Sequence, residues 1–87
     1  MKSQHRHASH TDISKRLKRA HGHLAKVIAM IQEGQSCVDL AQQLHAVESA
    51  ITNAKRELIH DHLEHCLADH TDTAHALDEL KQLSKYL

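Results

Sequence analysis

The chain has 87 residues, no proline, two glycines and one aromatic residue, Tyr86. A core without Phe or Trp is thin at this length, which argues against a β-sandwich or barrel and against a self-sufficient monomeric enzyme with a deep pocket. The net charge of zero is divided unevenly, because residues 1–26 carry seven Lys or Arg and one Asp, whereas residues 27–87 carry four Lys or Arg and ten acids.

Residues 1–10 show no apolar periodicity, so we expect a mobile arm that carries histidines. A helix is predicted over residues 11–33, capped at its start by Thr11 or Asp12 and stopped by Gly34. Its apolar side chains recur at alternating steps of four and three residues, which places them on one stripe. This stripe consists of Ile13, Leu17, Ala20, Leu24, Val27 and Ile31.

A longer helix is predicted over residues 36–67, where Ser36 and Asp39 form a sequence close to a capping box. At 1.5 Å per residue this helix is about 45 Å long. Its stripe consists of Cys37, Leu40, Leu44, Val47, Ile51, Ala54 and Leu58. A third helix is predicted over residues 72–86, with an apolar side made of Ala76, Leu80, Leu83 and Leu87.

These elements predict an all-α fold in which residues 11–87 form a single domain of three helices. One chain of this size cannot cover the second helix along its whole length. We therefore expect an antiparallel dimer that forms a four-helix bundle, with the third helix added at the ends. The alternative is a dimer with a purely structural role, against which the placement of the histidines and cysteines argues.

Sulfur and imidazole side chains lie at both ends of the second predicted helix. Cys37 is in its first turn, where the helix dipole and unpaired N–H groups stabilise a thiolate. His62 and Cys66 are four residues apart, so they share one face and are within reach of one metal ion. About 37 Å of straight helix separates Cys37 from His62, so these donors would meet only between two antiparallel chains. The alternative is an ordinary surface histidine and small core cysteines.

The excess of bases is concentrated in the first predicted helix. The cluster Lys15-Arg16-Leu17-Lys18-Arg19 spreads its charges around one side of that helix, and later bases extend it. A solvated face is the ordinary explanation, but duplex DNA contacted through its phosphates fits better when several copies align. The chain shows no helix-turn-helix spacing and lacks the aromatic residues that stack on single-stranded bases. The candidate DNA-binding residues are Lys15, Arg16, Lys18, Arg19, Lys26, Lys55 and Arg56.

No apolar run approaches the roughly 18–20 residues of a membrane-spanning helix, and no signal-peptide pattern is present. We therefore expect a cytoplasmic protein without membrane contact, in which the cysteines are reduced thiols. Glu57 and His60 have the Glu-x-x-His spacing of di-iron bundles, but those sites need a second such pair and two further Glu residues. Neither an enzymatic activity nor a small-molecule substrate is expected.

The basic cluster and the cysteine and histidine segments described above resemble those of the CsoR/RcnR-type family of metal-sensitive or formaldehyde-sensitive transcriptional repressors. The Cys-to-His gap of 25 residues and the His-x-x-x-Cys step both match the sensing site of that family. The resemblance implies a helical dimer that pairs into a flat tetramer, with an ion held by Cys37 of one subunit and His62 and Cys66 of another. The matching segments are residues 15–24, Cys37-Val38-Asp39, Gln42-Gln43-Leu44, Ala46-Val47 and residues 61–66.

The resemblance also implies a repressor that holds operator DNA when metal-free and releases it when the effector binds, which turns on export or resistance genes. Nickel and cobalt sensors of the family take a fourth ligand from the arm, at a position that corresponds to His5, with His7 as a near substitute. We therefore expect Ni(II) or Co(II) as the effector.

A Cu(I) sensor is the main alternative, because Cu(I) prefers two Cys and one His and would ignore His5. Copper sensors of the family place a Tyr directly before the Cys and a Glu in the third helix as supporting residues. Here Ser36 replaces the Tyr, and Glu79 aligns with the Glu. Zinc, formaldehyde and sulfur species are further alternatives, although formaldehyde sensors usually lack a Cys at position 66. A histidine-rich metal buffer that does not bind DNA would leave the basic cluster unexplained.

Overall fold

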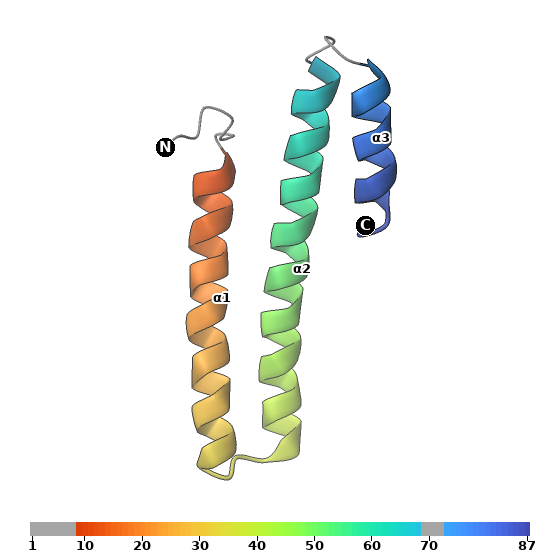
Figure 1. Ribbon diagram of the computed structural model, residues 1–87. Coiled ribbons are helices and arrows are strands. Elements are labelled where there is room, and N and C mark those ends of the chain that lie inside the picture. The colour runs from red at the N-terminus through yellow and green to blue at the C-terminus, as the bar shows by residue number, and fades with distance from the viewer. Residues whose placement is uncertain (1–8, 69–72) are drawn as a thin grey trace.

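A computed structural model of the chain describes residues 9–68 and 73–87 (Figure 1). These residues form three helices, α1 (Ser9–Gln32), α2 (Cys37–Ala68) and α3 (Thr73–Ser84), and no strand occurs among them. The all-α fold with three helices per chain is therefore confirmed. Helix α1 includes Ser9 and His10, which the sequence assigned to the arm. Asp12 in its first turn favours this earlier start, because a carboxylate stabilises the positive end of the helix dipole.

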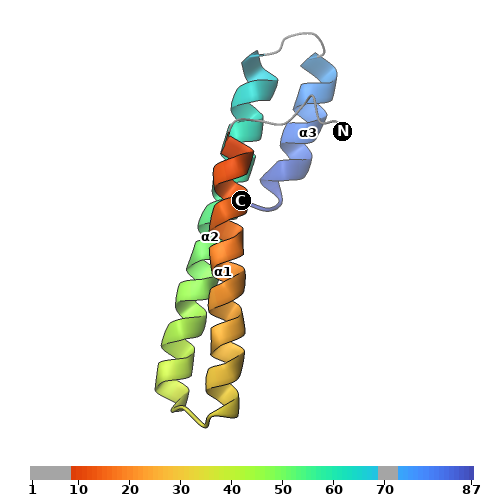
Figure 2. The same cartoon turned by 90° about the vertical axis from the view of Figure 1, so that its left-hand side faces the viewer.

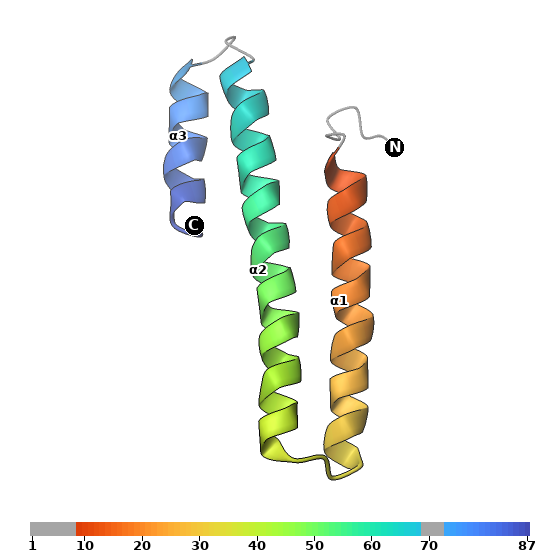
Figure 3. The same cartoon turned by 180° about the vertical axis from the view of Figure 1, so that it is seen from behind.

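Helices α1 and α2 form an antiparallel hairpin joined by a short turn (Figures 1 and 3). The turn has the two hydrogen bonds of a Schellman motif, from the N–H of Gln35 to the carbonyl of Met30 and from the N–H of Gly34 to the carbonyl of Ile31, both 3.1 Å. Gly34 has a φ of 78°, a left-handed conformation that glycine adopts without a Cβ penalty. Ser36 then caps α2, because its Oγ accepts a hydrogen bond of 3.2 Å from the N–H of Asp39.

The contact between α1 and α2 buries only every second residue of the predicted stripes. Residues spaced seven apart are buried on both helices, whereas the residues between them remain 38–55% exposed. A helix pair offers each stripe one neighbour, so half of each stripe has nothing to pack against within the chain. The buried stripe residues are Ile13, Ala20 and Val27 on α1 and Val47 and Ala54 on α2. Ile59 of α2, which lies outside the stripe, is also buried. The exposed stripe residues are Leu17, Leu24, Ile31, Leu44, Ile51 and Leu58.

The chain is long and thin. Its Cα atoms extend over 55 × 28 × 14 Å, and the thinnest dimension is about that of one layer of helices. The radius of gyration is 17.3 Å, whereas a compact domain of this length has about 12 Å. Helix α3 lies beside the carboxyl-terminal part of α2 and runs antiparallel to it (Figures 1 and 2). None of the described helices has a stretch that is both long and apolar enough to cross a membrane.

The two glycines give the same substitution opposite expected effects on stability. Neither Gly22 in α1 nor Gly34 in the turn has an atom within 4 Å of an added Cβ. Gly22→Ala should raise the free energy of unfolding by about 0.5–1 kcal/mol, because alanine loses less backbone entropy in a helix. Gly34→Ala should lower it by about 1–2 kcal/mol, because an L-residue is strained in the left-handed conformation. Urea denaturation of both variants measures the difference, and a change of the same sign in both would contradict the assigned turn.

Candidate functional site

The candidate metal ligands lie at opposite ends of one helix. Helix α2 is continuous over 32 residues, with Cys37 as its first residue and an exposed free thiol. His62 follows 25 residues later, which corresponds to about 37 Å along the helix axis. One chain therefore does not bring Cys37 and His62 together, and among the described residues no three His, Cys, Asp or Glu side chains are arranged so that they could hold a metal ion.

The remaining predicted ligands are not described to the same extent. Cys66 belongs to the final turns of α2, and its side chain lies outside the described part of the chain. His5 and His7 also lie outside the described residues. Because α1 and α2 are antiparallel, the described chain begins at the same end of the hairpin as His62 (Figure 1).

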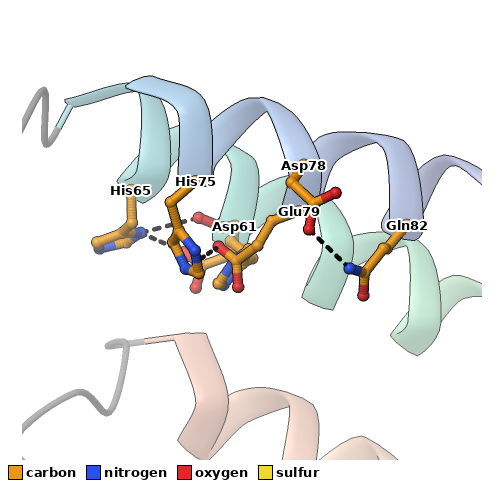
Figure 4. Close-up of polar contacts among 7 residues, drawn as sticks. Asp61, His65, His75, Asp78, Glu79 and Gln82 are labelled. Atoms are coloured by element: carbon orange, nitrogen blue, oxygen red, sulfur yellow. Dashed lines mark hydrogen bonds and ion pairs between the residues drawn. The ribbon is translucent and has the colours of Figure 1, made fainter. Parts of the chain in front are cut away.

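His62 contacts helix α3. Its Nε2 donates a hydrogen bond of 3.1 Å to Oε1 of Glu79, and both side chains are about one third exposed. His75 lies one turn before Glu79 on α3, with its Nε2 at 3.8 Å from the same carboxylate oxygen (Figure 4). The Glu79 carboxylate is thus shared by one imidazole from each helix. A histidine that binds a metal through one ring nitrogen commonly donates its other N–H to such a carboxylate.

A second histidine and a cavity lie at the same end of the molecule as His62. The Nδ1 of His65 donates a 2.8 Å hydrogen bond to the main-chain carbonyl of Asp61 and lies 3.5 Å from the Asp61 Oδ1 (Figure 4). A cavity of 330 Å³ adjoins the His62–Glu79 pair, and His10 of α1 and Tyr86 also line it. All three helices therefore contribute to the surroundings of His62.

Sequence reasoning did not single out His75, Asp61 or His65. The signal for His75 was its spacing of four residues from Glu79, which places the two side chains on the same face of a helix. Ser36, expected as a supporting residue at the metal site, caps α2. Glu79 does lie against His62.

The candidate DNA-binding residues are exposed. Arg16 of α1 forms an ion pair with Glu57 of α2 across the helix hairpin. Glu57 is the residue considered above for a di-iron pair, and here its carboxylate is engaged by this guanidinium. Arg56 lines the same surface hollow as Arg16 and Glu57, so the fold brings bases from both helices to one face. The exposed bases are Lys15, Arg16, Lys18, Arg19, Lys26, Lys55 and Arg56.

Comparisons with known proteins point to one group. A family model described as "Metal-sensitive transcriptional repressor" matches residues 9–86. The copper-sensing transcriptional repressor CsoR of Mycobacterium ulcerans (strain Agy99) is 45% identical over 53 residues, which cover 61% of this chain and 45% of that protein. CsoR of Mycobacterium tuberculosis (strain ATCC 25618 / H37Rv) is 35% identical over 74 residues, which cover 82% of this chain and 62% of that protein.

CsoR of Bacillus subtilis (strain 168) is 36% identical over 76 residues, which cover 84% of this chain and 75% of that protein. The chain thus spans less than two thirds of the length of the two mycobacterial relatives. No solved structure gives a significant match.

The hydrogen bond between His62 and Glu79 should hold α3 against α2. Glu79→Ala should raise the rate of amide hydrogen exchange in α3 by about fivefold, the equivalent of about 1 kcal/mol for one partly exposed hydrogen bond. Asp78→Ala is the matched control, because Asp78 accepts a 2.9 Å hydrogen bond from Gln82 within α3 itself. Equal exchange rates in the two variants would contradict a link between the helices at Glu79.

Proposed function

Because this chain belongs to the family of metal-sensitive transcriptional repressors, we propose that it binds duplex DNA and releases it when a metal ion binds. The observation that carries this proposal is the placement of Cys37 and His62 at opposite ends of one continuous helix. Donors so far apart within a chain serve one ion only where two chains meet. Binding of the ion then depends on quaternary structure, which is the requirement for a switch.

The exposed apolar residues of α1 and α2 favour the formation of a dimer. Six large apolar side chains on α1 and α2 are 38–55% exposed in a repeat of seven residues. Such a repeat is the pattern by which helices pack in bundles, and a second antiparallel chain would cover it. We propose that two hairpins form a four-helix bundle in this way. The start of α2 in one chain would then lie beside the end of α2 in its partner, and two such dimers would pair into the tetramer that the family resemblance implies.

For the effector we propose Cu(I). The expectation of Ni(II) or Co(II) finds no support among the relatives, which are named as copper-sensing repressors. Two thiolates and one imidazole form a soft, low-coordinate donor set that suits Cu(I). Cys37 of one chain would supply one donor, and His62 and Cys66 of another chain would supply the others. This set needs no ligand from the arm, so His5 and His7 have no role in it.

Glu79 fits a supporting role at this site. Its contact with Nε2 of His62 would fix the orientation of the ring, and we propose Nδ1 as the atom that binds the metal. A change in the position of His62 would be passed to α3 through this carboxylate. We propose that drawing Cys37 and His62 of different chains together shifts the paired α2 helices, so that the bases on neighbouring subunits no longer match the spacing of DNA phosphates. A coupling of about 1–3 kcal/mol per site is typical of such switches.

Dimer formation can be tested on the exposed half of the stripes. Ile51→Asp puts a carboxylate on a side chain that is 46% exposed in one chain and should convert the dimer to monomers, because a charge buried without a partner costs several kcal/mol. Leu77→Asp on α3 is the control, since Leu77 is 57% exposed and lies off the stripes. Sedimentation velocity at micromolar concentration measures both. A dimer that survives Ile51→Asp would contradict the proposed bundle.

The division between DNA binding and metal sensing can be tested with cysteine and histidine variants. Cys37→Ala and His62→Ala should leave the affinity of the metal-free protein for its DNA within about twofold while abolishing release by Cu(I), because they remove ligands and not bases. His45→Ala is the matched control, since His45 lies on the same helix with a side chain that is 80% exposed. It should keep full release.

The readout is fluorescence anisotropy of labelled DNA during anaerobic titration with Cu(I), Ni(II) and Co(II). Release of the wild-type complex by Ni(II) or Co(II) alone would restore the earlier expectation for the effector. Loss of DNA binding by metal-free Cys37→Ala would contradict the separation of roles.

A further inference from the structure

Arg16 is paired with an acidic residue on the basic face, the surface that it shares with Arg56. Its guanidinium donates a hydrogen bond to a carboxylate oxygen of Glu57, although the two residues are 41 positions apart in the sequence. The side chains are 48% and 42% exposed, so the pair lies at the surface and in contact with solvent. Glu57 also lines the same surface hollow as Arg16 and Arg56, so one acid shares this face with two bases.

A carboxylate and a phosphate make the same demands on an arginine. Both present negatively charged oxygens that accept hydrogen bonds from the guanidinium, and arginine binds both with similar geometry. While Glu57 holds Arg16, that guanidinium cannot give the same N–H groups to DNA. A contact between Arg16 and a phosphate therefore requires the ion pair to open.

We propose that Glu57 competes with DNA phosphates for Arg16 and thereby lowers the affinity of the metal-free protein for DNA. This inference rests on the proposed DNA-binding function. The competition is mild, because an exposed ion pair is easily broken. A phosphate displaces the carboxylate, and opening the ion pair in each chain of the assembly makes the free energy of DNA binding slightly less favourable. The protein then binds DNA strongly enough to repress and weakly enough to be released.

The direct test is removal of the competing charge. Glu57→Gln keeps the size of the side chain and should strengthen binding to a mixed-sequence DNA duplex by about two- to fivefold per chain, the range that an exposed ion pair covers. Binding should also become more dependent on salt, because Arg16 then meets phosphate without first leaving a carboxylate. Anisotropy titrations at several salt concentrations measure both effects.

Glu48→Gln is the matched control. It removes the same charge from an exposed position on α2, where Glu48 lies 3.9 Å from His45 and nine residues, about 13 Å of helix, before Glu57. A general reduction of negative charge would strengthen binding in both variants equally. A larger gain in DNA affinity is expected for Glu57→Gln, and equal gains in the two variants would overturn the inference. Circular dichroism verifies that each variant keeps its helical content.

A double-mutant cycle assigns the effect to Arg16. In an Arg16→Gln background the substitution Glu57→Gln should bring no gain beyond that of Glu48→Gln, because the contested guanidinium is gone. A gain that persists there would overturn the inference. Elution from immobilised heparin supplies a second readout that needs no operator. If the wild-type chain fails to bind any duplex, the proposed function fails, and equal elution of the Glu57 and Glu48 variants would then overturn the competition as well.

Discussion

The structure is governed by the fact that one chain can bury only half of its apolar stripes. Ile13, Ala20 and Val27 on α1 pack against α2, while the alternate residues of the same repeat face solvent. This leaves a hairpin whose radius of gyration exceeds that of a compact domain. The proposed dimer, and with it the proposed metal site between chains, would cover the exposed half.

Much of the fold could be predicted from local rules. The alternation of three- and four-residue steps predicted the helices, Gly34 marked the turn through its left-handed conformation, and Ser36 marked the start of α2. The periodic pattern did not distinguish the buried half of each stripe from the exposed half. That distinction depends on the angle at which α1 and α2 meet, which the spacing of apolar residues along one helix does not contain.

The site was less accessible from the sequence. The spacing of His62 and Cys66 placed them on one face, and the resemblance to the family drew attention to Glu79, which does contact His62. The pairing of Arg16 with Glu57 joins residues 41 positions apart, and only the register of the two helices brings them together. The choice between Ni(II) and Cu(I) depended on whether the arm supplies a ligand, and the donor types alone leave that question open because His5 and His7 are present in the sequence.

The repeat of seven residues has a consequence for how two hairpins would align. The exposed apolar residues of two chains face each other in the same pattern again after one chain slides along the other by one heptad, about 10 Å. Apolar contacts alone would therefore stabilise several alignments of the dimer almost equally. Cys37 at one end of α2 and His62 near the other end are each fixed at one position of the helix, so this pair of donors would come within bonding range in a single alignment. In the proposed arrangement, the bound ion would select one register of the dimer from several that bury similar apolar surface.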